Sequence, residues 1–159
     1  MFQRSSELFG SIHEDGKQNF FLKQSRRRLE KEFLAYDTTS VSSYSKSLKQ
    51  VKYGINKDHD HLPQLNLALL FGENSRLPVY YRKLPGNISD VLTIQNLLAD
   101  IDFLQIDKVK LVMDRGFYSE ANINAMYQKH YKFLIATKTS LKFVQKTLNE
   151  VSDTMVSRP

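Results

Sequence analysis

Apolar residues alternate with short polar breaks over most of the chain after residue 32. Runs rich in Leu, Val, Phe and Tyr, some of them alternating with polar positions, are typical of β-strands. They predict strands at residues 33–37, 65–72, 77–84, 108–113 and 131–138. A turn at residues 73–75 separates the second strand from the third, so we expect these two to form an antiparallel hairpin.

Two segments between the later strands have helical spacing instead. One helix, which begins at Ser89 or Asp90, is predicted to end near Asp102, because apolar residues recur three and four positions apart at Val91, Ile94, Leu97, Leu98 and Ile101. Ser119 is a suitable cap for a second helix through Tyr127. Strands joined by helical crossovers are expected to pair in parallel. The pattern therefore predicts an α/β fold, with one mixed sheet and flanking helices.

The segment FLAYDTTSV, at residues 33–41, raises a question about Asp37. Asp37 directly follows an apolar run and is itself followed by the hydroxyl residues Thr38, Thr39 and Ser40. We therefore expect the strand to end at Asp37. One interpretation is a turn or helix cap, because Asp, Ser and Thr side chains accept hydrogen bonds from nearby backbone N–H groups. The other is a ligand site, because the carboxyl ends of strands in α/β sheets are where ligands and metals bind.

The same transition recurs at Asp114, directly after the apolar run KLVM. Its repetition in two strands that we expect to be neighbours favours one shared site over two separate caps. Carboxylate oxygens are the donors that Mg²⁺ and Mn²⁺ prefer, and both ions also bind phosphate oxygens. Asp37 and Asp114 are therefore predicted to be metal ligands and catalytic residues in the cleavage or transfer of phosphodiester bonds.

Composition limits the other classes of site and partner. The chain has 159 residues, 41% of them hydrophobic, which suits one folded domain. It has no cysteine, which excludes disulfides, thiolate metal sites and cysteine nucleophiles. No run reaches the ~20 apolar residues of a membrane helix, so no membrane partner is expected. The formal charge of +6 and the pI near 9.4 indicate a polyanionic partner, with nucleic acid favoured.

Candidate DNA contacts lie in two places. Residues 23–33, KQSRRRLEKEF, are predicted to form a short basic helix or arm. Its cationic side chains either lie along a DNA phosphate backbone or simply face solvent. These side chains are Lys23, Arg26, Arg27 and Arg28. The second place is Arg115, which either contacts a DNA phosphate or pairs with a neighbouring carboxylate.

Several ordered blocks resemble a known family: YDTTS, LPQLNLALLFGENSRLPVYYRKLPGNISD and VKLVMDRGFYS. They are similar to the catalytic core of bacterial insertion-sequence transposases of the DDE type, in the insertion-sequence-four superfamily. The resemblance runs from about Phe33 to Lys138, and DRGFYS and PGNISD are its most specific parts. It implies a ribonuclease-H-like fold and a divalent metal site, with Asp37 and Asp114 as the first two acidic residues. It also implies double-stranded DNA at transposon ends as substrate, a homo-oligomer, and a cytoplasmic, nucleoid-associated location.

The third acidic residue of that family has no clear counterpart. Family members carry a Glu in a Tyr-x2-Arg-x3-Glu-x6-Lys pattern, and the nearest imitation here is Phe143, Lys146 and Glu150, in which both landmark residues before the Glu are changed. An exposed helical Glu is the ordinary interpretation of Glu150. We therefore expect a fragment with impaired or no activity. Its expected parts are a basic arm or helix at 1–32, a partial core at 33–140, and a helix and tail at 141–159.

Two further functions stay open from sequence alone. One is a ribonuclease-H-like, metal-dependent nuclease that uses Asp37 and Asp114 with another acid. The other is a catalytically dead remnant that binds DNA or a full-length transposase. The DHDH segment at residues 58–61 has residue types that bind metals, but beside Lys57 and Pro63 it is more typical of a solvated loop.

Overall fold

The structure, a computed structural model of the protein, describes residues 11, 13–27, 32–44, 48–54, 62–106 and 109–155. Three consecutive strands follow the first described helix, and helices and strands then alternate, as the hydrophobic pattern predicts. Their order is α2 (Glu14–Arg27), β1 (Leu34–Ser42), β2 (Gln64–Gly72), β3 (Pro78–Pro85), α3 (Asp90–Phe103), β4 (Lys110–Met113), the short 3-10 helix η1 (Arg115–Phe117), α4 (Glu120–Gln128), β5 (Lys132–Ile135) and α5 (Lys142–Met155).

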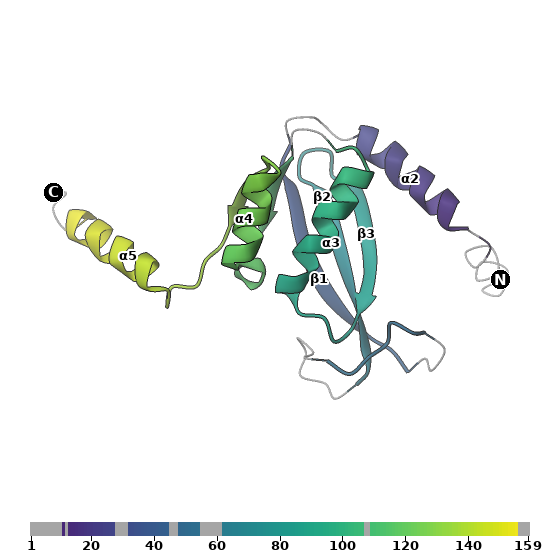
Figure 1. Cartoon of the computed structure of the whole chain (residues 1–159), viewed down its shortest axis with the longest axis horizontal. Coiled ribbons are helices and arrows are strands. Elements are labelled where there is room, and N and C mark those ends of the chain that lie inside the picture. The colour runs from purple at the N-terminus through teal and green to yellow at the C-terminus, as the bar shows by residue number, and fades with distance from the viewer. Residues whose placement is uncertain are drawn as a thin grey trace.

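The strands form one mixed sheet in the order β3-β2-β1-β4-β5 (Figure 1). β1 pairs with β2, and β2 with β3, in antiparallel fashion. β1 pairs with β4, and β4 with β5, in parallel. The predicted hairpin, the predicted parallel crossovers and the predicted α/β class are therefore confirmed. This order also makes β1 and β4 direct neighbours.

The prediction that the first strand ends at Asp37 is wrong. β1 continues to Ser42 and pairs with β2 along its whole length, from Leu34↔Gly72 to Ser42↔Gln64. The β-branched residues Thr38, Thr39 and Val41 suit an extended backbone, and β2 offers a partner for each of them. Asp37 consequently lies inside a strand rather than at its end.

The core lies on the face of the sheet that α3 covers. Along β1 the burial alternates, so that Leu34, Tyr36 and Thr38 are buried and the residues between them are exposed. α3 contributes the apolar stripe expected from its spacing, with Ile94, Leu97, Leu98 and Ile101 all buried. Burial of each such side chain stabilises the fold by roughly 1.5–3 kcal/mol, so this stripe fixes α3 against the sheet.

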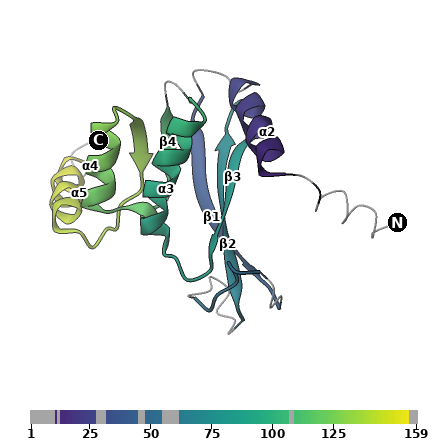
Figure 2. The ribbon, with the colours of Figure 1, turned by 45° about the vertical axis from the view of Figure 1, so that its right-hand side comes forward.

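The helices α2 and α5 differ in how they lie relative to the sheet. α2 packs on the edge strand β3 through Phe21, whose ring lies 4.8 Å from that of Tyr80 and 5.1 Å from that of Tyr81. It begins at Glu14, well before the predicted basic segment. α5 instead extends away from the sheet (Figures 1 and 2), with Phe143 and Leu148 exposed. Within the described residues, no helix is long and apolar enough to cross a membrane.

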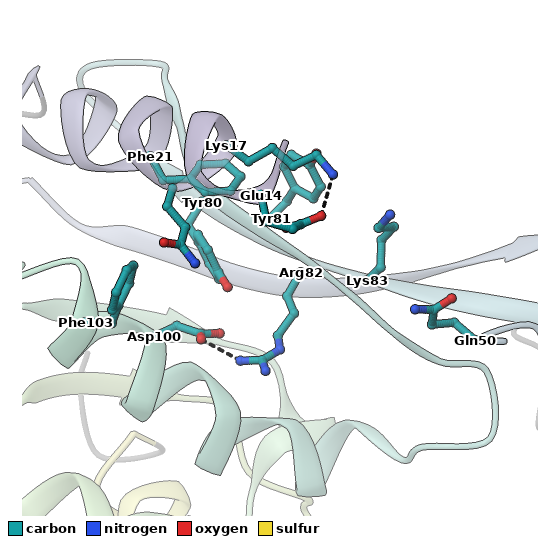
Figure 3. Close-up of a pocket in the computed structure, with 11 residues that line it drawn as sticks. Glu14, Lys17, Phe21, Gln50, Tyr80, Tyr81, Arg82, Lys83, Asp100 and Phe103 are labelled. Carbon is teal, nitrogen blue, oxygen red and sulfur yellow. Dashed lines mark hydrogen bonds and ion pairs between the residues drawn. The ribbon is translucent and has the colours of Figure 1, made fainter. Parts of the chain in front are cut away.

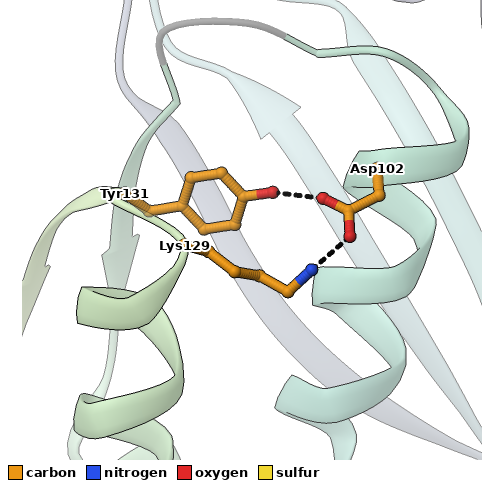
Figure 4. Close-up of polar contacts among 3 residues, drawn as sticks. All are labelled: Asp102, Lys129 and Tyr131. Atoms are coloured by element: carbon orange, nitrogen blue, oxygen red, sulfur yellow. Dashed lines mark hydrogen bonds and ion pairs between the residues drawn. The ribbon is translucent and has the colours of Figure 1, made fainter.

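A polar cluster joins the end of α3 to the end of α4 (Figure 4). Lys129 donates a hydrogen bond to Asp102 Oδ2, and the Tyr131 hydroxyl donates to Asp102 Oδ1 at 2.7 Å. The bond from Lys129, and then that from Tyr131, hold the pKa of the Asp102 carboxyl below its usual 3.8. Burial and the bond to Asp102 raise the pKa of Tyr131.

Acidification is expected to remove the stabilisation that this cluster provides. Because the pKa of Asp102 is lower in the folded chain than in the unfolded one, its contribution is complete above pH 3.8 and is lost as the pH falls through the folded value. The Asp102 side chain is half exposed, so we expect at most about 1 kcal/mol. Urea unfolding of wild type and Asp102→Asn at pH 7 and below pH 3 measures the difference. An equal difference at both pH values would contradict this assignment.

Candidate active site

The two predicted site residues directly follow paired positions of neighbouring strands. The parallel pairing of β1 with β4 runs from Leu34↔Leu111 to Tyr36↔Met113. The next residues along the two backbones are Asp37 and Asp114. Paired strands lie about 4.8 Å apart, so these two residues follow directly after backbone that is already side by side. The pairing of β1 with β4 thus brings together positions 77 residues apart in sequence.

Each carboxylate is oriented by a local backbone N–H group. Asp37 Oδ1 accepts a hydrogen bond from the Thr38 N–H at 2.7 Å. Asp114 is the N-cap of η1, and its Oδ1 accepts from the Gly116 N–H at 2.6 Å. The capping interpretation therefore holds for Asp114, but it does not compete with ligand binding, because an ionised carboxylate can accept about four hydrogen bonds. Both residues are exposed to solvent.

A buried aromatic pair supports the segment that carries Asp114. Phe117, the last residue of η1, is fully buried, and its ring lies 5.0 Å from that of Tyr36. Tyr36 directly precedes Asp37, so this contact connects the two segments that carry the carboxylates. Burial also raises the pKa of the Tyr36 hydroxyl to about 12, which keeps it neutral at physiological pH.

Asn122 supports the same segment from α4. Ser119 caps α4 as predicted, accepting a hydrogen bond from the Asn122 N–H at 3.1 Å. The buried Asn122 side chain then donates to Val91 O at 2.8 Å and to Phe117 O at 2.9 Å. It thereby joins the first turns of α3 and α4 to η1. Local sequence patterns do not indicate Asn122 or Phe117, because both act through contacts between distant parts of the chain.

Asp90 lies in the first turn of α3, where the sequence predicts only a helix cap. Its Oδ1 accepts a hydrogen bond from the buried Thr38 hydroxyl on β1. A Cβ placed on Gly116 would lie 3.2 Å from Asp90 Oδ2 and 3.0 Å from Asp114 Oδ1. Asp90 therefore lies beside the candidate pair. Its place in the specific block PGNISD is the one signal in the sequence that could have indicated it.

No third ligand joins the pair in the described part of the chain. There, no group of three or more His, Cys, Asp or Glu residues is arranged to hold a metal ion. Glu150 lies on the projecting helix α5, where its carboxylate is 4.0 Å from Lys146 Nζ. The DHDH segment at 58–61 lies outside the described residues. Two carboxylates still fit a hard divalent cation, since Mg²⁺ commonly binds one or two carboxylates and keeps several waters.

Comparison with known families decides the class of this domain. Residues 28–158 match a family model described as "Transposase DDE domain". The chain belongs to this family. No curated protein matches it. The match spans β1, β4 and both aspartates, and divalent metal use is a property of the DDE family.

Solved structures resemble the DDE domain in fold. The piggyBac transposase, in a synaptic complex with hairpin DNA, has a TM-score of 0.53 and 12% identity over 80% of this chain and 27% of that chain. The Mos1 transposase, in a paired-end complex with a left transposon end, has a TM-score of 0.47 and 11% identity over 94% of this chain and 57% of that chain. The first match supports a ribonuclease-H-like mixed sheet with flanking helices. The chain spans less than two thirds of either protein.

The predicted DNA contacts of the DDE domain lie on two separate elements. Lys23, Arg26 and Arg27 are exposed on α2, the two arginines in its last turn. Arg115 is exposed on η1, directly after Asp114. Arg28 lies outside the described residues. The structure thus separates the basic segment from the carboxylate pair and places Arg115 beside it.

A cavity of about 480 Å³ lies elsewhere in the DDE domain, between α2, β3 and α3 (Figure 3). Phe21, Tyr80 and Phe103 contribute aromatic surface to it, and Arg82 Nη1 pairs with Asp100 Oδ1 at 2.5 Å on its wall. Burial raises the pKa of the Tyr80 hydroxyl to about 12. None of the predicted catalytic residues lines this cavity.

Proposed function

We propose that this chain is a catalytic-core segment of a DDE transposase, which cleaves and joins DNA strands at the ends of a mobile element with Mg²⁺ or Mn²⁺. The observation that carries the proposal is the parallel register of β1 and β4, which brings Asp37 next to Asp114 inside a chain of the DDE family. Hard carboxylate oxygens are the donors that these ions select.

In this proposal Asp37 and Asp114 hold the divalent ion. When bound, such an ion polarises the scissile phosphate and makes a water or hydroxyl oxygen more nucleophilic. The Thr38 and Gly116 N–H groups orient the two carboxylates. Arg115, which directly follows Asp114, would contact a DNA phosphate, which a guanidinium can bind in bidentate fashion.

The proposed substrate is double-stranded DNA at transposon ends, bound by more than one protomer on the nucleoid of the cytoplasm. Support comes from the basic charge of the chain and from its similarity in fold to the piggyBac transposase, which was solved in a synaptic complex with hairpin DNA. Each cationic side chain that meets a phosphate releases condensed counterions, so binding of this kind weakens with salt.

Replacing Arg26, Arg27 and Arg28 with Gln is expected to lower the salt dependence of duplex binding. Each lost phosphate contact should reduce the slope of log K against log salt by about 0.9, and the total should reach roughly 2–3. Fluorescence anisotropy with a labelled duplex at several salt concentrations measures this slope. A variant with Lys138, Lys142 and Lys146 replaced by Gln loses equal charge elsewhere. Equal slopes for both variants would mean that the basic segment only faces solvent.

Strand cleavage in Mn²⁺ tests the enzymatic proposal and the role of Glu150. We expect weak nicking of duplex DNA by the wild-type chain, because the described residues supply no third ligand and one missing electrostatic stabiliser typically lowers rates ~10²–10³-fold. Asp37→Ala should abolish the nicking, and Glu150→Ala should not change it. Loss of activity in Glu150→Ala would instead identify Glu150 as the third ligand.

Within the described residues, no third His, Cys, Asp or Glu completes a metal-binding group with the pair, and this also favours a second candidate function, a DNA-binding remnant without catalysis. That candidate predicts DNA binding that is unaffected by Asp37→Ala, together with no cleavage in Mn²⁺. A nuclease that acts on any duplex would show equal cleavage of element ends and unrelated DNA.

A further inference from the structure

Asp90 connects the two segments that carry the candidate metal ligands. From α3 its carboxylate reaches β1, where Oδ1 accepts from the Thr38 hydroxyl. Its Oδ2 lies against Gly116, on the side of η1 where Asp114 Oδ1 also lies. The Asp90 carboxylate therefore binds Thr38, the residue after Asp37, and also lies near Asp114.

The contact with Thr38 bears directly on Asp37. Thr38 is buried with 3% of its surface exposed, and its hydroxyl points to the α3 face of the sheet. Its backbone N–H donates to Asp37 Oδ1 at 2.7 Å. Fixing the Thr38 side chain thus fixes the amide that orients Asp37, while Asp37 itself faces the opposite side of the strand.

The position of Asp90 beside Gly116 bears on Asp114. The Gly116 N–H donates to Asp114 Oδ1, and the space beside its Cα is bounded by the carboxylates of Asp90 and Asp114. A side chain at position 116 would require these carboxylates to shift by a few tenths of an ångström. Asp90 itself is held at the N-terminal end of α3, where the helix dipole stabilises a negative charge.

We propose that Asp90 is a positioning residue for the metal site: it fixes Asp37 through Thr38 and limits the position of Asp114 across Gly116. It acts through these contacts and not as a third metal ligand, in keeping with the absence of a three-residue ligand group in the described chain. The proposal rests on the proposed function only in assuming that Asp37 and Asp114 bind a divalent ion.

Mn²⁺ binding by the whole chain, followed by electron paramagnetic resonance, gives the first readout. Thr38→Val, which loses the hydroxyl, should bind Mn²⁺ about 10–100-fold more weakly, the usual effect of losing an outer-shell hydrogen bond. Thr38→Ser and Asp90→Asn, which keep a donor and an acceptor, should stay close to wild type. Asp90→Ala should bind Mn²⁺ at least as weakly as Thr38→Val, because it also removes the carboxylate beside Gly116. The double variant should bind no more weakly than Asp90→Ala, because Thr38→Val breaks an interaction that Asp90→Ala already lacks.

Amide hydrogen exchange of the metal-free protein gives a second readout that needs no metal. In Asp90→Ala the Thr38 and Gly116 amides should exchange at least about tenfold faster, because hydrogen bonds to charged groups are among the stronger ones. The Leu97 amide in α3 serves as an internal control and should not change. Faster exchange of all three amides would indicate general destabilisation and would overturn the proposal.

The two readouts separate failure of this proposal from failure of the proposed function. If wild type binds no Mn²⁺, the proposed function fails, and the exchange rates alone decide whether Asp90 positions the two carboxylates. If wild type binds Mn²⁺ but Thr38→Val binds equally well, the positioning role is wrong. Equal losses in Asp90→Asn and Asp90→Ala, with Thr38→Val unchanged, would show that Asp90 acts through its charge instead.

Discussion

Replacing Asp114 with Asn is expected to weaken Mn²⁺ binding by the chain at least about 100-fold. Substitutions of residues that only contact metal ligands already reduce affinity 10–100-fold, and Asp114 is proposed as a ligand itself. Asn keeps the size of the side chain and can still cap η1 by accepting from the Gly116 N–H, so the fold should be retained. Asp37→Asn should have a similar effect, because both carboxylates serve one ion.

Isothermal titration with Mn²⁺ measures this loss, and two exposed acids provide matched controls. Asp15→Asn, in the first turn of α2, and Glu150→Gln, on α5, each remove one negative charge from other elements. Neither should change the affinity more than about twofold, since exposed charges at a distance are screened by salt. Equal losses in the controls would mean that Mn²⁺ binds through general charge rather than at the pair.

Phe117→Ala is expected to lower the free energy of unfolding by about 3–5 kcal/mol, the usual range for a buried Phe. Phe117 is fully buried, contacts the ring of Tyr36, and accepts a hydrogen bond from Asn122 at its carbonyl oxygen. Loss of the ring leaves a cavity under η1, so the segment with Asp114 should also lose its fixed position.

Urea unfolding of wild type, Phe117→Ala and Phe117→Leu tests this prediction. Leu keeps most of the buried volume and should lower the stability by less than about 1.5 kcal/mol. A Phe117→Ala variant as stable as Phe117→Leu would show that η1 can collapse onto the core without the ring. In that case the aromatic pair would not be what holds the Asp114 segment against β1.

Local patterns were sufficient to predict most of the sheet and its helices. The apolar spacing of α3, the Ser119 cap of α4 and the short turn between β2 and β3 each depend on residues close together in sequence. The length of β1 was not predictable in this way. Thr38-Thr39-Ser40 suits either a cap or a strand, and the choice is made by pairing with residues of β2 far along the chain.

The site was predictable only in part for the same physical reason. Asp37 and Asp114 each follow an apolar run, which the sequence makes visible, and their roles as ligands stay predictions. Asp90 looked like an ordinary residue of a helix N-terminus, and its hydrogen bond to Thr38 spans 52 positions. Glu150 kept the family's spacing, yet α5 carries it away from the sheet, because spacing along one helix does not determine where that helix lies.

The most direct test of the central claim is to locate the divalent ion on the protein. Nuclear magnetic resonance of the ¹⁵N-labelled chain with a small fraction of Mn²⁺ broadens the amide signals closest to the bound ion. We predict that the Thr38 and Gly116 signals broaden first in wild type, and that Asp37→Asn abolishes this broadening. Broadening centred on residues 58–61 or on Glu150, with Thr38 and Gly116 unaffected, would contradict the assignment of Asp37 and Asp114 as the metal-binding pair.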